Sequence, residues 1–322
     1  MAAEQVRHPG PFDGIVAGKM TGEILSDPTG RPIGALGPAR RGYAGCRAVL
    51  ATMHGKEIPI GPALWATARL HVATVGGLDT DELGTFTGEI PRVGTMLEVA
   101  IRKARMGMAA ARWPVGLASE GSFGPHPVLA FVPAGLELLV LVDDGSGLVI
   151  HESLVVEKTN FSHLVVTPGQ DLGDYLRRIG FPSHGLVVRP NAGHPTTITA
   201  KGIIDRESLE DAVARAQTQS LDGQARLETD MRAHRNPTRM RSLGELADRL
   251  GRRLATRCPT CRAPGWGRTD VVTGLPCAWC GQPTDLVARE VFTCAAGPHR
   301  DERPRSDGLT AADPGRCATC NP

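Results

Sequence analysis

The sequence predicts an α/β fold, in which helices flank a mixed sheet, followed by a small cysteine-rich module. Short apolar runs typical of buried strands alternate with amphipathic helical segments through residues 46–240. Seven of the eight cysteines lie within the last 65 residues, and six of them form C-x-x-C pairs. An amphipathic helical segment at 241–256 links the two parts.

The composition is that of an ordinary globular protein. The 322 residues suffice for about two domains, and 41 % of them are hydrophobic. A net charge of +2 excludes a polycation, and no apolar run reaches the roughly 18 residues that a membrane span needs. The N-terminus lacks the pattern of an export signal, so we expect a cytoplasmic protein with reduced cysteines.

The patterns divide the chain into four segments. Residues 1–45 are rich in glycine and proline and are expected to form an N-terminal arm. Residues 46–240 are expected to form the α/β domain, 241–256 a linking helix and 257–322 the cysteine-rich module.

Within the α/β domain the elements follow from hydrophobic spacing and end signals. Thr95 and Glu98 have the spacing of a capping box in front of a long amphipathic helix. Asp205 precedes another helical segment as an N-cap residue. The predicted helices are 62–71, 96–111, 171–179 and 207–219, and the predicted strands are 47–52, a hairpin over 136–157, 186–189 and 196–198.

Residues 117–127, LASEGSFGPHP, are expected to form a glycine-rich loop at the end of a buried strand. Loops at strand ends are where α/β proteins place their ligands. Glu120 and His126 are therefore candidate catalytic residues. The alternative is a tight structural turn with a solvated Glu120.

The cysteine spacing predicts structural zinc. Cys258, Cys261, Cys277 and Cys280 form two C-x-x-C pairs fifteen residues apart, and we expect them to share one ion. A second site is expected from the ligands that follow them, which are Cys294, His299, Cys317 and Cys320. His299 is alternatively a bystander. Zinc held by four protein ligands stabilises a segment that is too small to bury a core of its own.

Polar residues gather in three motifs that are typical of an anion site. Phosphate groups are bound by lysine, arginine and backbone N–H groups, and Mg²⁺ by carboxylates. The motifs are TMHGK at 52–56, the acidic stretch with its helix at 79–103, and 119–126. The candidate phosphate-binding residues in them are Thr52, Lys56, Arg92, Lys103, Ser119 and Ser122. The alternative for each motif alone is a surface ion pair or a helix cap.

The segments HGKE, LDTDELGTFTGEIPR, ASEGSFGPHP and ETDMRAHRNPTRM, followed by paired C-x-x-C, resemble an uncharacterised bacterial family of unknown function. The resemblance covers residues 47–280 and implies no established activity.

The segment EVAIRKA at 98–104 and Ser119-Glu120-Gly121 also resemble, more distantly, the inosine triphosphate pyrophosphatase superfamily. That resemblance implies a metal-dependent phosphohydrolase acting on a nucleotide or a related phosphorylated small molecule. Lys56 would hold phosphate, Glu98 and Glu120 would hold Mg²⁺, and Lys103 would steady the phosphate or the carboxylates. His126 would act as an acid or base. His54 stands where that family has asparagine, which departs from the pattern.

Arginines cluster between residues 226 and 268, with eleven arginines against four acids. Arg232, Arg235 and Arg239 are candidates to complete the phosphate site from the other side. The alternative is an internal ion-pair clamp that docks the last helix. A different function class also stays open, in which the zinc module and the 226–268 arginines bind nucleic acid or a protein partner without catalysis.

Overall fold

The computed structural model describes residues 42–84, 90, 93–126, 131–194 and 196–322. The chain forms two compact units. One contains Gly45–Asp143 and His151–Gly251, and the other contains Asp144–Ile150, Arg252–Pro322 and residues 42–44. Most of the expected N-terminal arm lies outside the described residues, and so does Arg92.

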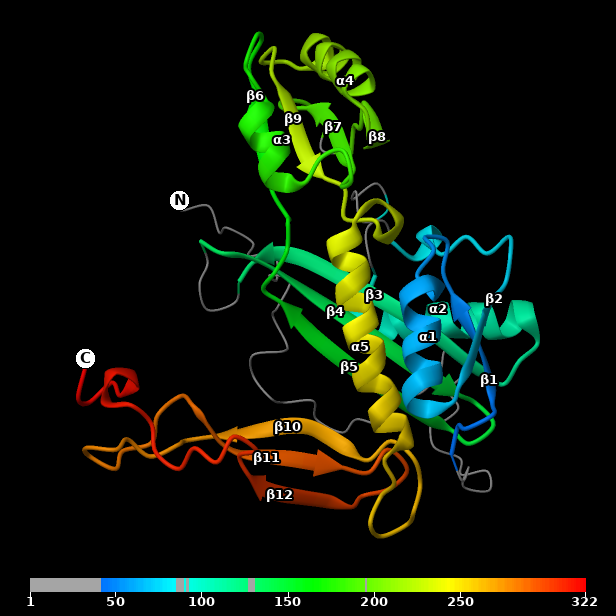
Figure 1. Ribbon diagram of the computed structural model, residues 1–322, viewed down its shortest axis with the longest axis vertical. Coiled ribbons are helices and arrows are strands. Elements are labelled where there is room, and N and C mark those ends of the chain that lie inside the picture. Colours follow the sequence, from blue (N-terminus) through cyan, green and yellow to red (C-terminus); the bar gives the residue numbers. More distant parts are fainter. Residues whose placement is uncertain (1–41, 85–89, 91–92, 127–130, 195) are drawn as a thin grey trace, which may run out of the picture. The chain divides into compact units, whose positions relative to one another are not determined.

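The larger unit is built on a mixed five-stranded sheet, which confirms the predicted fold class (Figure 1). Its strand order is β2-β1-β3-β4-β5, with β1 parallel to β2 and β3, and β3 antiparallel to β4. The strands are β1 Arg47–Ala51, β2 His71–Thr74, β3 Val115–Pro125, β4 Pro133–Asp143 and β5 Leu148–Val156, of which β5 begins in the segment assigned to the smaller unit.

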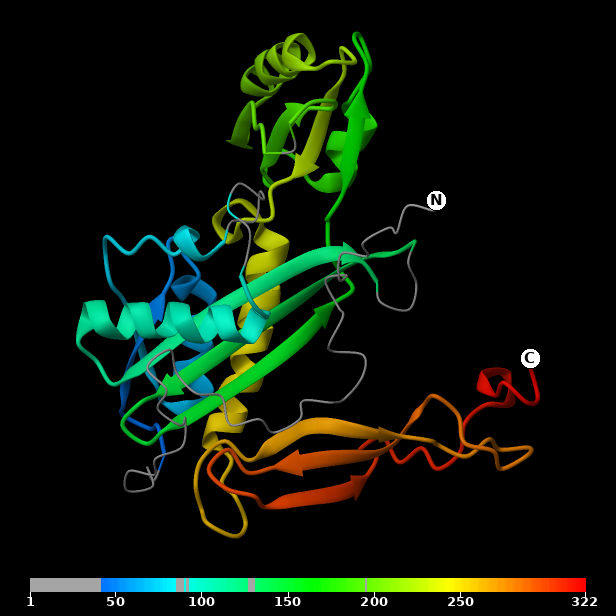
Figure 2. The same ribbon diagram turned by 180° about the vertical axis from the view of Figure 1, so that it is seen from behind.

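Helices cover both faces of this sheet. The helices are α1 Glu57–Ala68, α2 Met96–Ala111 and α5 Pro237–Ala255. Helices α1 and α5 share one face, where Gly244 of α5 lies against Pro59 of α1. Helix α2 covers the opposite face, where Gly107 lies against Ala51 of β1 (Figures 1 and 2). Glycine at these positions lets helix and neighbouring backbone approach closely.

The glycine-rich stretch expected as a loop at 117–127 is instead the long strand β3. It pairs with β4 without interruption from Val115 opposite Asp143 to Pro125 opposite Pro133. The apolar partner strand supplies a complete hydrogen-bonding edge, and this outweighs the turn preference of the glycines. The side chains of 119–125 therefore alternate between the two faces of the sheet and do not gather at one end.

The second part of this unit has a sheet of its own, whereas the sequence predicted a single mixed sheet for residues 46–240. Strand order is β6-β9-β7-β8, and Leu186, Leu227 and Leu209 lie in its core. Asp205 caps its longer helix through Ser208, as predicted. The elements are β6 His163–Val166, α3 Gly173–Ile179, β7 Leu186–Pro190, β8 Ala200–Ile203, α4 Arg206–Gln219 and β9 Ala225–Thr229.

The C-terminal module is a three-stranded antiparallel sheet of order β10-β11-β12. Its strands are β10 Gly267–Thr273, β11 Val287–Thr293 and β12 Arg300–Pro304. The expected linking helix is the C-terminal part of the longer α5. Single-turn 3-10 helices are η1 Asp81–Leu83, η2 Ala233–Arg235 and η3 Pro314–Arg316. No helix in the described part of the chain has the length and hydropathy of a transmembrane span.

Candidate metal centres and ligand pocket

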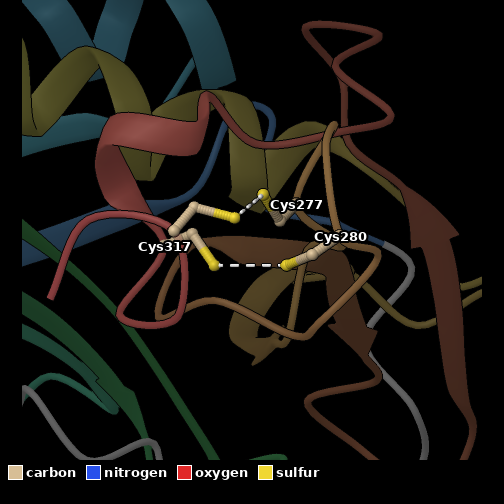
Figure 3. A group of neighbouring side chains, drawn as sticks. Cys277, Cys280 and Cys317 are labelled. Atoms are coloured by element: carbon tan, nitrogen blue, oxygen red, sulfur yellow. Dashed lines mark hydrogen bonds between the residues drawn. The ribbon is translucent and has the colours of Figure 1, made fainter.

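The C-terminal module gathers four thiols in one place, those of Cys277, Cys280, Cys317 and Cys320. The sulfurs lie within 4.8 Å of one another, with Cys277 Sγ 3.9 Å from Cys320 Sγ and Cys280 Sγ 3.6 Å from Cys317 Sγ (Figure 3). These separations are too long for disulfides and suit thiolates around a common ion. The set fits a structural, tetrahedral Zn²⁺ site.

Three further thiols form a second cluster. Cys258, Cys261 and Cys294 also lie within 4.8 Å of one another, with 3.5 Å between the sulfurs of Cys261 and Cys294. Cys258 and Cys294 are buried beside Trp266. Among the described residues these two clusters are the groups of three or more His, Cys, Asp or Glu placed to share an ion.

The clusters divide the cysteines differently from the sequence expectation, in which Cys258 and Cys261 share an ion with Cys277 and Cys280. The fifteen residues between the pairs contain the whole of β10, seven residues that span about 23 Å. The two pairs therefore lie at opposite ends of one strand. A bridge between Cys277 and Ala312 draws the C-terminal segment, with its own C-x-x-C pair, to the far end.

Backbone N–H groups point at several of the sulfurs. Trp279 N lies 3.5 Å from Cys277 Sγ and Ala296 N lies 3.3 Å from Cys294 Sγ. Hydrogen bonds from the backbone of Cys320 and Thr319 lower the pKa of the Cys317 thiol to about 6. A thiol poised to ionise is suited to metal binding, because the thiolate is the ligand.

The larger unit carries a pocket of about 530 Å³ at the carboxyl ends of β1 and β2. Thr52 and Gly55 line it from the loop after β1, and Gly76, Gly77 and Asp79 line it from the loop after β2. Strands β1 and β2 are neighbours, yet the helices that follow them, α1 and α2, cover opposite faces of the sheet. The pocket thus opens at the point where the chain leaves the sheet in two directions.

Lys56 stands in the chain between the pocket-lining residues Gly55 and Glu57, at the N-cap of α1, and its side chain is buried. Its Nζ donates to the carbonyl oxygen of Ser119 at 3.2 Å and contacts Ser119 Oγ at 3.0 Å. Because β1 ends at Ala51, opposite Ala118, Ser119 is the first residue of β3 beyond that pairing. Burial, followed by the nearby charge of Arg239, lowers the pKa of Lys56 to about 8.

On the same face of β3, Arg239 and Glu137 form a buried ion pair. Arg239 Nε lies 2.5 Å from Glu137 Oε1, and Nη2 lies 3.1 Å from Oε2. Arg239 also donates to the carbonyl of Met231. Gly121, opposite Glu137 in the β3–β4 register, leaves the space for this pair. Arg239 stands in the first turns of α5, so the pair docks that helix onto β4.

Glu120 points to the other face of β3, where its carboxylate lies 2.6 Å from Lys103 Nζ of α2. Glu98 caps the start of the same helix, since its Oε2 accepts from Thr95 N at 2.7 Å. These hydrogen bonds, chiefly from the Thr95 backbone, lower the pKa of Glu98. Glu98 and Lys103 are five residues apart, about 140° around the helix, and so project from different sides.

His54 and His234 stack with 4.8 Å between ring centroids, where the loop after β1 meets the 230–239 stretch. Burial is the largest cause that lowers the pKa of His54 to about 3, and the charge of Lys56 is the next. His54 is therefore neutral at pH 7. The charges of His234, Arg232 and Arg239 also lower the pKa of His54.

A family model describing a domain of unknown function, DUF6671, matches residues 103–322. The chain belongs to the DUF6671 family. Searches of curated proteins and of solved structures gave no match. The expected membership in an uncharacterised family is thus confirmed, and the resemblance to inosine triphosphate pyrophosphatases stays a prediction. The DUF6671 match contains β3, α5 and both cysteine clusters, whereas the loop after β1 precedes it.

The structure brings some of the predicted site residues together and separates others. Lys56, Ser119 and Arg239 meet on the α1 side of β3, and Lys103 meets Glu120 on the α2 side. Thr52 lines the pocket, and its Oγ1 accepts from His54 N at 3.2 Å. The predicted Mg²⁺ pair of Glu98 and Glu120 has its carboxylates engaged by Thr95 and Lys103.

His126 and Ser122 do not join the contacts that Lys56, Ser119 and Arg239 make on the α1 side of β3. His126 follows the end of β3, about 20 Å along the strand from Glu120. Its backbone N donates to the carbonyl of Val132 at 2.7 Å. Ser122 lies on the same side of β3 as Glu120, by strand alternation. An extended strand separates residues that a tight loop would have joined.

The remaining arginines of the DUF6671 region are mostly engaged within the protein. Arg232 pairs with Asp230, its Nη2 lying 2.6 Å from Oδ2. Arg235 packs against Gly185 and Gly202 of the second sheet. Arg226, Arg249 and Arg268 also have acidic partners. These contacts favour the interpretation of the arginines as an internal ion-pair clamp over their interpretation as an open basic surface. Arg92 lies outside the described residues.

Glu137 is a structural determinant of this cluster that was not among the candidate residues from the sequence, and Gly121 appeared there only within the motif Ser119-Glu120-Gly121. Glu137 is an isolated acid in the apolar run LELLVLV, and an acid at a core position of a strand signals a buried cation partner. Its partner Arg239 is 102 residues away, so no local pattern identifies it.

Proposed function

We propose that this protein binds a nucleotide or a related phosphorylated small molecule in the pocket at the carboxyl ends of β1 and β2. The position of the pocket carries the proposal. In open α/β sheets, ligands bind outside the carboxyl ends of the strands. The pocket has this position, because it lies between the loops that follow the neighbouring parallel strands β1 and β2.

The lining chemistry supports this class of ligand. Gly55, Gly76 and Gly77 allow close approach of a ligand to the backbone. Asp79 and Glu57 place carboxylates at the rim, and a carboxylate after the second strand is suited to accept hydrogen bonds from ribose hydroxyls. The phosphates would then lie toward the loop that opens α1, at the positive end of the helix dipole.

The charges of the buried side chains near the loop after β1 also support an orientation with the phosphates toward that loop. Lys56 hydrogen-bonds the neutral oxygens of Ser119, while Lys103 and Arg239 are matched by Glu120 and Glu137. These five buried side chains carry three positive and two negative formal charges. An anionic group in the loop after β1 would be attracted by the excess positive charge.

Hydrolysis of a phosphoanhydride is the reaction class to test first. The carboxylates of Glu98 and Glu120 are already engaged by Thr95 and Lys103. Any Mg²⁺ would therefore be brought into the pocket by the phosphates of the ligand. Water attack would be promoted by metal charge on the phosphoryl oxygens. The protein's own contribution would be to bind and orient the phosphates.

Isothermal titration calorimetry with nucleoside mono-, di- and triphosphates, with and without Mg²⁺, tests the proposal. We expect binding by the wild type and a loss of at least about tenfold in affinity for Asp79→Asn. Asp211→Asn, at an exposed position on α4, is the matched control and should bind like the wild type. Phosphate release in the same mixtures separates a hydrolase from a binding protein.

Absence of binding for every phosphorylated ligand, with the fold intact by thermal melting, would overturn the proposal. The alternative is that the C-terminal module binds nucleic acid or a protein partner. The observation in its favour is Trp279, which is 79 % exposed between Cys277 and Cys280. An exposed aromatic ring on a rigid turn is suited to stacking or to docking in a partner's pocket.

A further inference from the structure

The cluster of Cys258, Cys261 and Cys294 has one ligand fewer than a closed zinc site needs. Structural Zn²⁺ is almost always four-coordinate, with sulfur or imidazole nitrogen ligands. The other cluster in the module has four thiols and is complete by this criterion. The sequence confines the search for the missing ligand, because His299 is the single histidine after His234 and every cysteine except Cys46 already belongs to a cluster.

His299 lies directly across a hairpin from Cys294. The β11–β12 pairing ends with Thr293 opposite Arg300. One step further, Cys294 N donates to the carbonyl oxygen of His299 at 2.9 Å. Residues opposite one another in an antiparallel pair project to the same face, with Cβ atoms about 5 Å apart. The imidazole of His299 therefore projects to the side on which the Cys294 sulfur meets the other two thiols.

The apolar contacts of His299 hold it beside the same cluster. Its ring stacks on Trp266 with 4.9 Å between centroids and 20° between planes. Trp266 in turn packs with Cys258 and Cys294 in the small core of the module. His299 is half-buried. Rotation about its side-chain bonds is enough to turn a ring nitrogen from the indole toward the thiols, because the backbone already faces them.

We propose that Cys258, Cys261, Cys294 and His299 form a zinc site of three thiolates and one imidazole, beside the four-thiolate site of Cys277, Cys280, Cys317 and Cys320. Three thiolates and a neutral imidazole give this site a formal charge of −1 with Zn²⁺, against −2 for the four-thiolate site. The two sites of one small module then differ in ligand set. The inference is independent of the nucleotide pocket, because it concerns other residues in the other compact unit.

The test uses the full chain with Zn²⁺ or with Co²⁺ in its place. We expect wild type to hold two ions, and His299→Ala to release one of them at least about tenfold faster to a competing chelator. His299→Cys should keep both ions tightly bound. His163→Ala, at an exposed position in β6, is the control and should match the wild type. Near-ultraviolet and circular dichroism spectra verify that each variant is folded.

Cobalt absorption distinguishes a ligand from a merely structural histidine. If His299 ligates, His299→Cys shifts the visible bands of one ion toward those of an all-thiolate site. A structural role on Trp266 predicts unchanged visible bands in His299→Cys and His299→Ala. Two ions held as tightly in His299→Ala as in wild type, with an unchanged cobalt spectrum, would overturn the assignment.

Discussion

At the scale of single residues, two buried cations of the larger unit contact carboxylates and a third contacts a neutral side chain. Lys103 meets Glu120 and Arg239 meets Glu137, so each carboxylate has a cation within hydrogen-bonding distance. Lys56 donates to Ser119, which carries no charge. Burial of this ammonium group is the largest cause of its lowered pKa, and the nearby charge of Arg239 is the next.

Lys56 should make the stability of the larger unit rise with pH in an alkaline window. Its pKa falls from 10.5 to about 8 on folding, so between those values the unfolded chain holds the proton and the folded one does not. Stability then increases with pH, by roughly 3 kcal/mol over the whole window. Below pH 8 both states are protonated, and the cost of the buried charge is fully present.

Lys56→Met should remove this alkaline increase. The measurement is the free energy of unfolding by urea at pH 7.5 and at pH 10, compared between wild type and variant so that other titrating groups cancel. Lys201→Met, at an exposed position in β8, is the matched control and should retain the increase. An equal pH dependence in wild type and Lys56→Met would contradict the prediction.

At the scale of elements, strand β3 is the organising piece of the larger unit. Alternate residues face α2 on one side and α1 with α5 on the other, so one strand binds helices from both layers. Gly116 lies against Met108 of α2, whereas Gly121 lies against Arg239 of α5. Glycines that read as turn signals in the sequence serve here to bring helices close to the sheet.

Gly121→Ala should destabilise the unit by roughly 2–4 kcal/mol, because its Cβ would strike a buried ion pair. That Cβ would lie 2.6 Å from Arg239 Nη2 and 2.7 Å from Glu137 Oε2. Gly61→Ala in α1 is the control. Its Cβ meets Val72 at an ordinary 3.9 Å, and alanine favours the helix by about 1 kcal/mol. Denaturation midpoints that fall equally in both variants would refute this account of Gly121.

At the scale of the whole molecule, the chain combines an α/β unit having an apolar core with a small module in which four cysteines are among the few buried residues. The module's buried cluster consists of Cys258, Trp266 and Cys294, with Phe292 and Ala296 against it. So few apolar side chains provide little driving force for folding, and metal binding supplies the rest. The DUF6671 match covers the module and most of the larger unit.

Paired cysteine variants separate the observed grouping of the thiols from the grouping by sequence order. We expect Cys258→Ser with Cys277→Ser to weaken both sites, leaving no zinc after dialysis against a chelator. Cys277→Ser with Cys317→Ser should damage one site and leave about one ion per chain. Grouping by sequence order predicts the reverse, one ion for the first pair of changes and none for the second. Elemental analysis of zinc per chain decides between them.

The sequence by itself determined the features that depend on neighbours within a few residues. The capping box of Thr95 and Glu98 and the N-cap Asp205 are examples, because helix ends are set within one turn. The C-x-x-C turns belong with them, since both thiols of a pair are placed by one tight turn. Helices α1 to α5 and strands β1, β4, β5 and β7 also followed from local periodicity, whereas β2, β6, β9 and the three strands of the C-terminal module were not predicted.

Only the tertiary structure decided which of these local pieces meet. The cysteine pairs separate because β10 extends between Cys261 and Cys277, and they recombine through strand pairing. The stretch around Glu120 becomes a strand because β4 pairs with its full length. Arg239 finds Glu137 across 102 residues. Strand register and the choice of pairing partner are properties of the assembled sheet. The hydrogen bonds and burial of that sheet outweigh the local turn and strand preferences of single residues.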